Sequence, residues 1–409
     1  MTTEHSTPPA VLIIEHGESF GGSIVSIGQT VQHLQKVKPI LITFMDTRIS
    51  SQWTKDIENI HLKNNFSYKQ RHAFNDFLYK HIHIKFICVL AQKLFSLLSL
   101  LNDELLARKI SGHGKSRKIK LVHSNNGISP LAYRVAQLLN VPITYHLRGP
   151  GWHNQHSKKI QNAAQKYIAI TKFLADQYQK QLGLAAEKFL ILHNPIDITA
   201  IHNQSPATIE NARAQMHANA DDVVYLISAR IIPFKGQLEF IQLCMPLLQK
   251  YSHFKIALMG DSADENVDYF TSIQNTIKQY NLGQQITLLG FRSNPLPYIS
   301  AADVIVHFSL GPEGFGRSIT EAWAAKKPII ATAIGGPIEL ISDGKDGYLV
   351  DPHNIAQCQE KIDLLLTHPD LRATLGNNGF SRVLESFSQE KIAAQLEAAL
   401  IESMSSDFV

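Results

Sequence analysis

Two segments in the second half of the chain combine charged residues with glycines in a pattern suited to a phosphorylated ligand. Arg230 and Lys235 lie in one loop between a predicted strand and a predicted helix. Two cations on one loop can neutralise a departing diphosphate. Residues 313–322 (EGFGRSITEA) place Glu313 in a glycine loop and Glu321 in the following helix. Two carboxylates beside the free amides of a helix start can hold several hydroxyl groups and a phosphate.

Each of these residues also has a structural explanation. Arg230 and Lys235 could be exposed loop cations, and Glu321 could simply interact with the dipole of its helix. A retaining hydrolase also uses two carboxylates, but they face each other about 5–5.5 Å apart across the scissile bond. One carboxylate on a loop and one on a helix favour binding over hydrolysis. Gly335 and Gly336, before another helix, are by themselves a turn.

The first half offers a weaker set of candidates. Gly21 and Gly22 follow the first predicted strand and open a helix, where backbone amides favour an anion, although a simple turn explains them as well. The glycines do not form GxGxxG, which argues against a nicotinamide dinucleotide. His146 ends another predicted strand, beside Arg148 and Gly149. Either His146 contacts a ligand at this edge, or it is a structural histidine.

Several other kinds of site are excluded by missing motifs. The sequence has no GxSxG nucleophile elbow, no GxxxxGK[ST] phosphate loop and no HExxH pair. The three cysteines, Cys88, Cys244 and Cys358, are far apart and indicate neither a disulfide framework nor a zinc site. We therefore expect no metal ligands and no cofactor.

The elements that must position these residues follow an α/β rhythm. Short apolar runs alternate with helical stretches, which is typical of parallel sheets covered by helices. The polar segment 198–222 interrupts this rhythm, and a helical pattern runs from residue 355 to the end with a break near residues 376–379. Two doubly wound domains with a linker and a cleft between them are expected. The predicted strands are 11–15, 39–43, 121–124, 143–146, 167–170, 190–192, 223–228, 255–259, 286–289, 304–307, 328–331 and 348–350, and the predicted helices include 23–37, 130–140, 172–182, 237–251 and 318–325.

Length and composition agree with two globular domains. The chain has 409 residues, 44% hydrophobic and 18% charged, which is enough apolar material for two cores. The net charge of +4 is uneven: residues 1–205 hold 24 Lys and Arg against 12 Asp and Glu, and the remainder holds 15 against 23. A basic first half favours an anionic partner, unless the bias is random. No signal-peptide pattern opens the chain, so a cytoplasmic location is expected.

Residues 66–120 depart from the alternation of predicted strands and helices. Residues 82–101 are strongly apolar but contain Lys85 and Lys93, which argues against a membrane-spanning helix. Nine Lys and Arg and two acidic residues lie between Lys80 and Lys120. The segment is therefore either a helix on an anionic membrane surface or a core helix followed by a solvated basic loop.

Taken together, these residues resemble glycosyltransferase family 4, the retaining, nucleotide-sugar-dependent enzymes with the GT-B fold. The similarity is densest between residues 230 and 350, where Glu313 and Glu321 reproduce the family's E-x7-E spacing. The first half matches more thinly. Other matching segments are Gly21-Gly22, His146, Asn194-Pro195-Ile196-Asp197, Gly260-Asp261, Leu289-Gly290-Phe291, Ala302-Asp303-Val304, Gly335-Gly336, Glu339-Leu340 and Gly347.

The resemblance implies a GT-B architecture, α/β, with two Rossmann-like doubly wound domains facing a central cleft. Residues 1–200 would be the acceptor-binding domain, residues 201–385 the donor-binding domain, and the helix within 386–409 would pack back on the first domain. The catalytic residues implied are His146, Arg230, Lys235 and Glu313. The donor-binding residues implied are Gly21, Gly22, Arg230, Lys235, Gly260, Glu313, Gly314, Phe315, Gly316, Ser318, Ile319 and Glu321.

The resemblance also implies the roles of these groups. Arg230 and Lys235 would hold the diphosphate, Glu321 the ribose, and Glu313 and His146 the donor sugar. The enzyme would be a hexosyltransferase that needs no metal and retains the anomeric configuration. Arg317, in a loop position that is often apolar in the family, leaves the fit of the donor open.

The expected partners are a nucleotide sugar, most simply UDP- or GDP-linked, and a glycan or lipid-linked acceptor used in cell-surface polysaccharide or lipopolysaccharide assembly. Residues 80–120 would place the chain on the inner face of the cytoplasmic membrane, and no nucleic acid is expected. The alternatives are a non-catalytic nucleotide-sugar-binding subunit and a GT-B-like epimerase. A phosphorylase would need a pyridoxal-phosphate lysine, which the sequence does not identify, and an epimerase would need an acid/base cluster.

Overall fold

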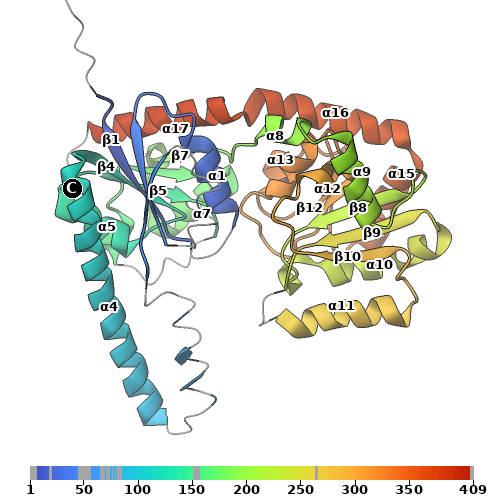
Figure 1. The fold of residues 1–409 in the computed structure, drawn as a ribbon, viewed down its shortest axis with the longest axis horizontal. Coiled ribbons are helices and arrows are strands. Elements are labelled where there is room, and N and C mark those ends of the chain that lie inside the picture. Colours follow the sequence, from blue (N-terminus) through green and yellow to red (C-terminus); the bar gives the residue numbers. More distant parts are fainter. Residues whose placement is uncertain are drawn as a thin grey trace, which may run out of the picture. The chain divides into compact units, whose positions relative to one another are not determined.

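The computed structural model describes residues 7–17, 21–44, 57–64, 70, 74–75, 77–78, 80, 85–150, 157–262 and 266–405. The chain divides into two compact units, each with its own parallel sheet (Figure 1). Unit 1 contains Met1–Ile170, Leu174–Leu192 and Ile392–Val409, and unit 2 contains Thr171–Phe173 and His193–Lys391. Apart from the short stretch Thr171–Phe173, the chain passes from unit 1 to unit 2 between residues 192 and 193. The domain boundary was expected from the sequence between residues 200 and 201.

The sheet of unit 1 has the order β3-β2-β1-β4-β5-β6-β7, with every pair parallel. The order reverses between β1 and β4, so the loops that leave these two strands diverge at the carboxyl edge of the sheet. β3 was not among the predicted strands, because its sequence ENIH is short, polar and only partly buried. The strands are β1 (Ala10–Glu15), β2 (Lys38–Thr43), β3 (Glu58–His61), β4 (Ile119–Asn125), β5 (Ile143–Leu147), β6 (Lys166–Ala169) and β7 (Phe189–Ile191).

Helix α1 (Gly22–Val31) ends earlier than its predicted end at residue 37. A turn follows, in which the amides of His33 and Leu34 donate to the carbonyls of Thr30 and Val31, and a carboxylate from the far end of the chain binds the amides beyond it. Glu397 of α17 (Gln389–Met404) accepts hydrogen bonds from the backbone amides of Gln35, Lys36 and Val37. These amides therefore cannot extend α1. The other helices of this unit include α5 (Pro130–Leu139), α6 (Lys158–Gln161) and the part of α7 (Lys172–Leu182) from Leu174 on.

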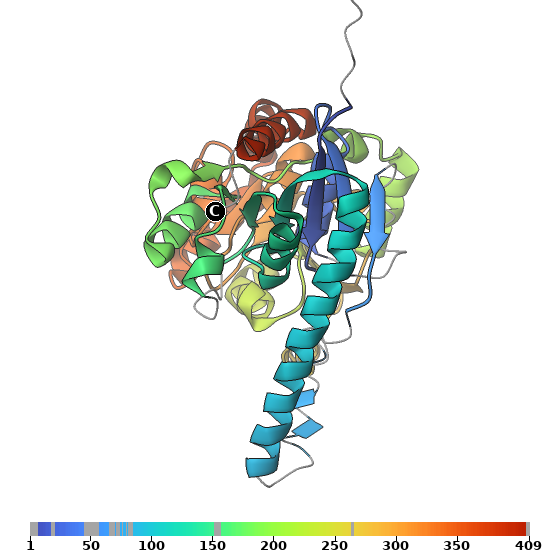
Figure 2. The same cartoon turned by 90° about the vertical axis from the view of Figure 1, so that its left-hand side faces the viewer.

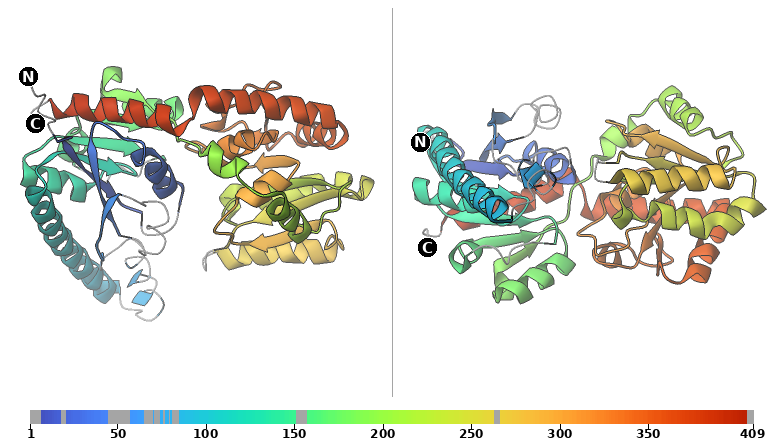
Figure 3. Two further views of the ribbon diagram at one scale, coloured as in Figure 1. Left: turned by 45° about the horizontal axis from the view of Figure 1, so that its top comes forward. Right: turned by 90° about the horizontal axis from the view of Figure 1, so that it is seen from below.

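Helix α17 also contributes to the core of unit 1. Leu396 and Leu400 belong to the same buried cluster as Val11 of β1 and Ile24 of α1. The helix lies alongside this sheet in the views of Figure 3. Residues from both ends of the chain therefore stabilise one core.

Helix α4 (Lys85–Ser116) is buried only in its second part. Leu106 and Ile110 are buried, and the helix packs on α5. Its first part runs beyond the sheet (Figures 1 and 2) and leaves Leu90 and Leu94 more than half exposed. The expectation of an ordinary core helix is therefore wrong for most of residues 87–105, where only Cys88 and Ser99 are buried, and residues 82–84 lie outside the described residues. In the described part of the chain, no helix is both long enough and apolar enough to cross a bilayer.

The sheet of unit 2 has the order β10-β9-β8-β11-β12-β13, again all parallel. Each strand confirms a prediction from the sequence. The order reverses between β8 and β11, which places the loops after these strands side by side at the carboxyl edge. The strands are β8 (Val223–Ser228), β9 (Phe254–Met259), β10 (Ile286–Gly290), β11 (Val304–His307), β12 (Ile329–Thr332) and β13 (Tyr348–Val350).

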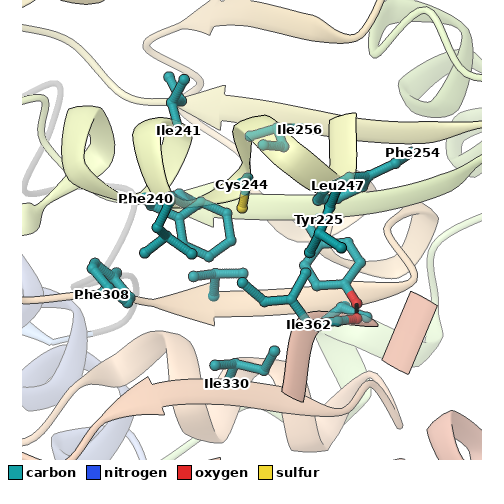
Figure 4. Packing of buried hydrophobic residues seen from close by; sticks show 14 of the residues in the cluster. Tyr225, Phe240, Ile241, Cys244, Leu247, Phe254, Ile256, Phe308, Ile330 and Ile362 are labelled. Carbon is teal, nitrogen blue, oxygen red and sulfur yellow. Dashed lines mark hydrogen bonds between the residues drawn. The ribbon is translucent and has the colours of Figure 1, made fainter. Parts of the chain in front are cut away.

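The core of unit 2 lies between its sheet and α10 (Gln237–Lys250) and α15 (Ile355–Thr367) (Figure 4). Tyr225 of β8 and Phe240 of α10 are fully buried there. The Tyr225 hydroxyl donates a hydrogen bond to the carbonyl of Ile362 at 2.7 Å, so its one polar group is satisfied. The remaining helices are α8 (Ile198–His202), α9 (Pro206–Gln215), α11 (Val267–Gln279), α12 (Leu296–Ala301), α13 (Arg317–Ala324), α14 (Pro337–Leu340) and α16 (Pro369–Ser386).

Two expectations about helices in this unit are corrected. The polar segment 198–222 contains α8 and α9, and α9 begins with Ser205 as its N-cap and Pro206 in its first turn. Helix α16 continues through Gly376 and Gly379, where a break was expected. A Cβ at Gly376 would collide with the backbone of Lys326, and one at Gly379 with the Trp323 ring. These glycines allow two helices to pack closely and do not end the helix.

Candidate functional site

The loop after β8, which carries Arg230 and Lys235, is fixed by backbone contacts on two sides. The Ile231 amide donates to the Asp261 carbonyl at 2.9 Å, and the Leu310 amide donates to the Phe234 carbonyl at 2.8 Å. The side chain of buried Gln237 donates to the Arg230 carbonyl at 2.8 Å. The loop is therefore held rigidly between the ends of β9 and β11.

Glycines make these close approaches possible. Gly260, with φ +155°, would clash through any Cβ with the carbonyl of Ala229. Gly236 has φ +63°, and its Cβ would meet the Phe308 carbonyl. Gly260 was expected to bind the donor; in the structure it is the contact that seats the Arg230 loop on the strand beside it.

The β8 and β11 loops meet in a polar cluster around Glu313. Lys235 Nζ donates to Glu313 Oε2, and Ser309 Oγ donates to the same oxygen at 2.9 Å. Lys235 Nζ also lies 3.5 Å from Ser309 Oγ. His307, at the end of β11, places Nε2 3.7 Å from Glu313 Oε2 and Nδ1 2.9 Å from Ser318 Oγ. Lys235, Glu313 and Ser318 of the predicted set are thus brought together.

Burial and neighbouring charges set the protonation states in this cluster. Burial lowers the pKa of His307 to about 4. The charge of Glu313 acts in the opposite direction and raises this pKa, and the charge of Lys235 lowers it by a smaller amount. Burial alone would raise the pKa of Glu313, but His307, Lys235 and Ser309 outweigh it and hold that pKa below 4.5. At neutral pH the cluster therefore contains the carboxylate of Glu313 and the neutral imidazole of His307.

The glycine loop that carries Glu313 is pressed against Gly335 and Gly336. Glu313 and Gly335 form a β-bridge, and the Gly336 amide donates to the Glu313 carbonyl at 2.8 Å. A Cβ on Gly336 would lie 2.6 Å from the Gly314 carbonyl. The second glycine pair thus supports the Glu313 loop, and with it the buried Phe315.

Helix α13 begins directly after this loop, with Gly316 as its N-cap at φ +87°. The Ile319 amide already donates to the Gly316 carbonyl at 2.9 Å, so a ligand would have to share this donor. Glu321 lies one turn from Arg317, whose Nη2 is 3.2 Å from Glu321 Oε1. The unusual Arg317 is therefore the partner of the glutamate expected to bind a ribose.

Two groups on these loops remain available to a ligand. Among the described residues, the exposed guanidinium of Arg230 has no ion-pair or hydrogen-bond partner, and Glu313 Oε1 has none either. The ammonium of Lys235 has three donors, of which Glu313 and Ser309 take at most two. The arrangement offers cationic donors for phosphate oxygens beside a carboxylate that can accept from sugar hydroxyls.

The other predicted residues, Gly21, Gly22 and His146, lie in unit 1. Gly21 is the extended N-cap of α1, with open space where a Cβ would be. His146 is 3% exposed at the carboxyl end of β5. Among the described residues, no group of three or more His, Cys, Asp or Glu is arranged to hold a metal ion.

Sequence reasoning missed several residues of these clusters. His307 and Ser309 follow the apolar run of β11, and nothing in their spacing relates them to Lys235. Glu15, the last residue of β1, is fully buried. A carboxylate closing an apolar strand was the one signal that could have identified Glu15, because buried carboxylates are rare without partners.

Comparison with known proteins adds independent evidence. Residues 208–382 match the family model of glycosyl transferases group 1, and residues 67–200 match that of glycosyltransferase family 4. The capsular polysaccharide biosynthesis glycosyltransferase CapM of Staphylococcus aureus is 31% identical over 182 residues, 44% of this chain and 46% of CapM. Trehalose synthase of Thermococcus litoralis is 27% identical over 237 residues, 56% of each chain. The match thus spans about half the length of these relatives.

A solved structure agrees with the fold. Anabaena Alr3699/HepE, crystallised in complex with UDP and glucose, superimposes with a TM-score of 0.74 at 21% identity, over 96% of this chain and 99% of that one. This similarity confirms the GT-B architecture of two Rossmann-like parallel sheets. One family model matches residues 67–200, most of which belong to unit 1, and the other matches residues 208–382 of unit 2. The chain therefore belongs to the group 1, family 4 glycosyltransferases.

Proposed function

We propose that the chain is a retaining glycosyltransferase that moves a sugar from a nucleotide diphosphate sugar to a glycan or lipid-linked acceptor of cell-surface polysaccharide. The observation that carries the proposal is the Lys235–Glu313 pair at the strand-order reversal of unit 2, with Lys235 on the loop that also carries Arg230. CapM, a capsular polysaccharide enzyme by name, and HepE, crystallised with UDP and glucose, support the substrate classes.

In the proposed reaction, the bond between the anomeric carbon and the diphosphate oxygen breaks, and a bond to the acceptor oxygen forms on the same face. The acceptor's proton passes to the departing phosphate. Arg230 and Lys235 stabilise the charge that grows on the diphosphate, and Glu313 and Glu321 orient hydroxyl groups of the sugar and ribose. Two cations on one loop, of which Lys235 is held by Glu313 and Ser309, would supply charge neutralisation that a metal ion supplies in other transferases, so the reaction is proposed to be metal-independent.

The experiment is an assay of nucleoside diphosphate release across UDP-, GDP- and ADP-sugars, with glucose and undecaprenyl-linked glycans as acceptors. Acceptor-dependent release from one donor, with the product glycosidic bond in the donor's configuration by NMR, is the expected result. Transfer to free glucose alone would favour the chemistry named for the trehalose synthase relative. Tight binding of a donor without release would contradict transfer and indicate a non-catalytic subunit.

A lipid-linked acceptor is proposed because of the exposed face of α4. Seven apolar side chains, each at least 40% exposed, recur at helical spacing along one stripe. Nine of the eleven charged residues between Lys80 and Lys120 are basic, and each near an anionic surface contributes about 1 kcal/mol. We propose an anionic bilayer as the occupant of this stripe, with the protein located at the inner face of the cytoplasmic membrane. The stripe consists of Ile87, Leu90, Leu94, Leu97, Leu98, Leu101 and Leu105.

The double substitution Leu94→Glu with Leu97→Glu is expected to lower the fraction of protein that sediments with phosphatidylglycerol vesicles at low salt by about tenfold, because two side chains worth about 1.5–3 kcal/mol each can no longer be buried. Leu384→Glu, on an exposed apolar residue of α16, is the matched control and should sediment like the wild type. If the double variant sedimented with the vesicles as well as the wild type does, the membrane assignment would be contradicted. It would also be contradicted if the substitutions instead abolished a dimer seen in analytical ultracentrifugation.

A further inference from the structure

A chain of buried and partly buried hydrogen bonds crosses the carboxyl edge of the sheet in unit 1. Glu15 at the end of β1 accepts from Asn125 at the end of β4. Asn125 Oδ1 accepts from Arg148 Nε at 2.7 Å, and Arg148 Nη2 lies 3.4 Å from His146 Nδ1. β1 and β4 are the strands between which the order reverses. The four residues thus occupy the position where open α/β sheets bind ligands.

The direction of each hydrogen bond is set by chemistry. A guanidinium can only donate, so the Asn125 amide must turn its oxygen toward Arg148 and its NH2 group toward Glu15. Glu15 accepts from this NH2 group through Oε2, and from the Gly17 amide at 2.7 Å and Ser23 Oγ at 3.2 Å through Oε1. His146 Nδ1 must then be an acceptor, which places the imidazole proton on Nε2.

Burial prevents His146 from carrying a second proton. Burial, the charge of Arg148 and the neighbouring His123 together lower the pKa of His146 well below 6.5. The His123 ring faces His146 at a centroid separation of 5.4 Å, and burial with Arg148 lowers the pKa of His123 to about 3. Both rings are neutral at pH 7, so the single proton of His146 stays on Nε2.

The Nε2 atom of His146 is buried and has no hydrogen-bond partner among the described residues. An unpaired buried N–H group is costly, by about 1–3 kcal/mol. A donor kept in this state, in a residue only 3% exposed, is suited to an acceptor that arrives with a ligand. Sugar hydroxyl and phosphate oxygens are such acceptors.

We propose that Arg148 is a positioning residue that fixes His146 in its Nε2–H tautomer, so that His146 donates a hydrogen bond to a substrate oxygen and does not act as a proton acceptor. Asn125 and Glu15 hold the guanidinium of Arg148 in place. The substrate assignment rests on the proposed transferase function, whereas the tautomer assignment does not. The inference adds Glu15, Asn125 and Arg148 to the residues on which the reaction depends.

The tautomer can be measured without any turnover. Long-range 15N–1H correlation spectra of protein labelled with 15N-histidine, recorded at pH 7.5, should show His146 with a protonated Nε2 and an unprotonated Nδ1. Signals absent from the His146→Gln spectrum identify the residue. Arg148→Met should shift the two nitrogens toward a mixture of tautomers. An Nδ1–H tautomer in the wild type, or unchanged His146 signals in Arg148→Met, would overturn the proposal.

Kinetics test the consequence for the reaction. Arg148→Met is expected to lower kcat by about 10- to 100-fold, the usual effect of removing a group that orients a reactive side chain, with the KM for the nucleotide sugar within about twofold. Arg134→Met removes a guanidinium of the same unit that pairs with Glu104 and should leave kcat unchanged. An equal loss in Arg134→Met, or a loss confined to KM, would overturn the positioning role. If no donor were turned over, the proposed function would fail while the wild-type spectrum still decided the tautomer.

Discussion

Lys235→Ala is expected to lower kcat by about 10²- to 10³-fold, the scale of losing one preorganised group that stabilises developing charge. Lys235 is mostly buried and fixed by Glu313 and Ser309. It need not move to meet a departing diphosphate, so its charge acts in the transition state without reorganisation. The measurement is nucleoside diphosphate release at saturating donor and acceptor.

Lys250→Ala is the matched control, because Lys250 forms an exposed ion pair with Asp363 in the same unit and should leave kcat unchanged. Lys235→Arg should recover part of the activity by restoring the charge. Lys235→Ala with wild-type kcat would show that Arg230 alone, or another group, neutralises the leaving diphosphate.

The same substitution has a consequence for pH. Lys235 is one of the groups that hold the pKa of Glu313 below 4.5 against its burial. Without Lys235, that pKa must rise, and Glu313 becomes protonated at higher pH than in the wild type. The acidic limb of kcat against pH should therefore move upward in Lys235→Ala, provided that Glu313 acts as a carboxylate.

The sheets of both units were largely predictable, because buried parallel strands are apolar runs bounded by polar loops. β3 escaped because ENIH does not have this pattern. The failure of α1 to reach residue 37 could not be predicted, since the carboxylate that binds the amides of residues 35–37 is Glu397, more than 350 residues away. The glycines of α16 indicated a break only because the groups that fill their space, the Lys326 backbone at Gly376 and the Trp323 ring at Gly379, come from another part of the chain.

The candidate site was predictable in its residues but not in its pairings. Lys235 and Glu313 lie in loops with a recognisable composition, whereas the contact between them depends on β8 and β11 being neighbours in the sheet. The pairing of Arg317 with Glu321 could have been read from their spacing of four residues on a helix. His307 carries no such local signal, and the only signal of Glu15 is a carboxylate at the end of a strand that is otherwise core.

Trp323→Ala is expected to lower the free energy of unfolding of unit 2 by about 3–5 kcal/mol, the usual cost of a truncated buried tryptophan. The indole is fully buried, and its Nε1 donates to the Asp346 carbonyl at 2.6 Å. Trp323 lies on α13, two residues after Glu321, so its loss also loosens the helix that presents this glutamate. Urea denaturation followed by far-UV circular dichroism measures the change, and Trp323→Phe, which keeps a ring, should cost less.

The contact between Gly379 on α16 and the Trp323 indole can be tested, because Gly379→Ala should change the free energy of unfolding differently with and without the indole. Next to the indole, any Cβ at Gly379 collides with the ring, so Gly379→Ala should destabilise the wild type. In the Trp323→Ala background the collision is gone, and the same change replaces a helical glycine by the better helix former, worth up to about 1 kcal/mol. Gly379→Ala should then be neutral or stabilising. If Gly379→Ala destabilised both backgrounds equally, the indole would not occupy this space. Residues in contact are expected to show non-additive changes in the free energy of unfolding.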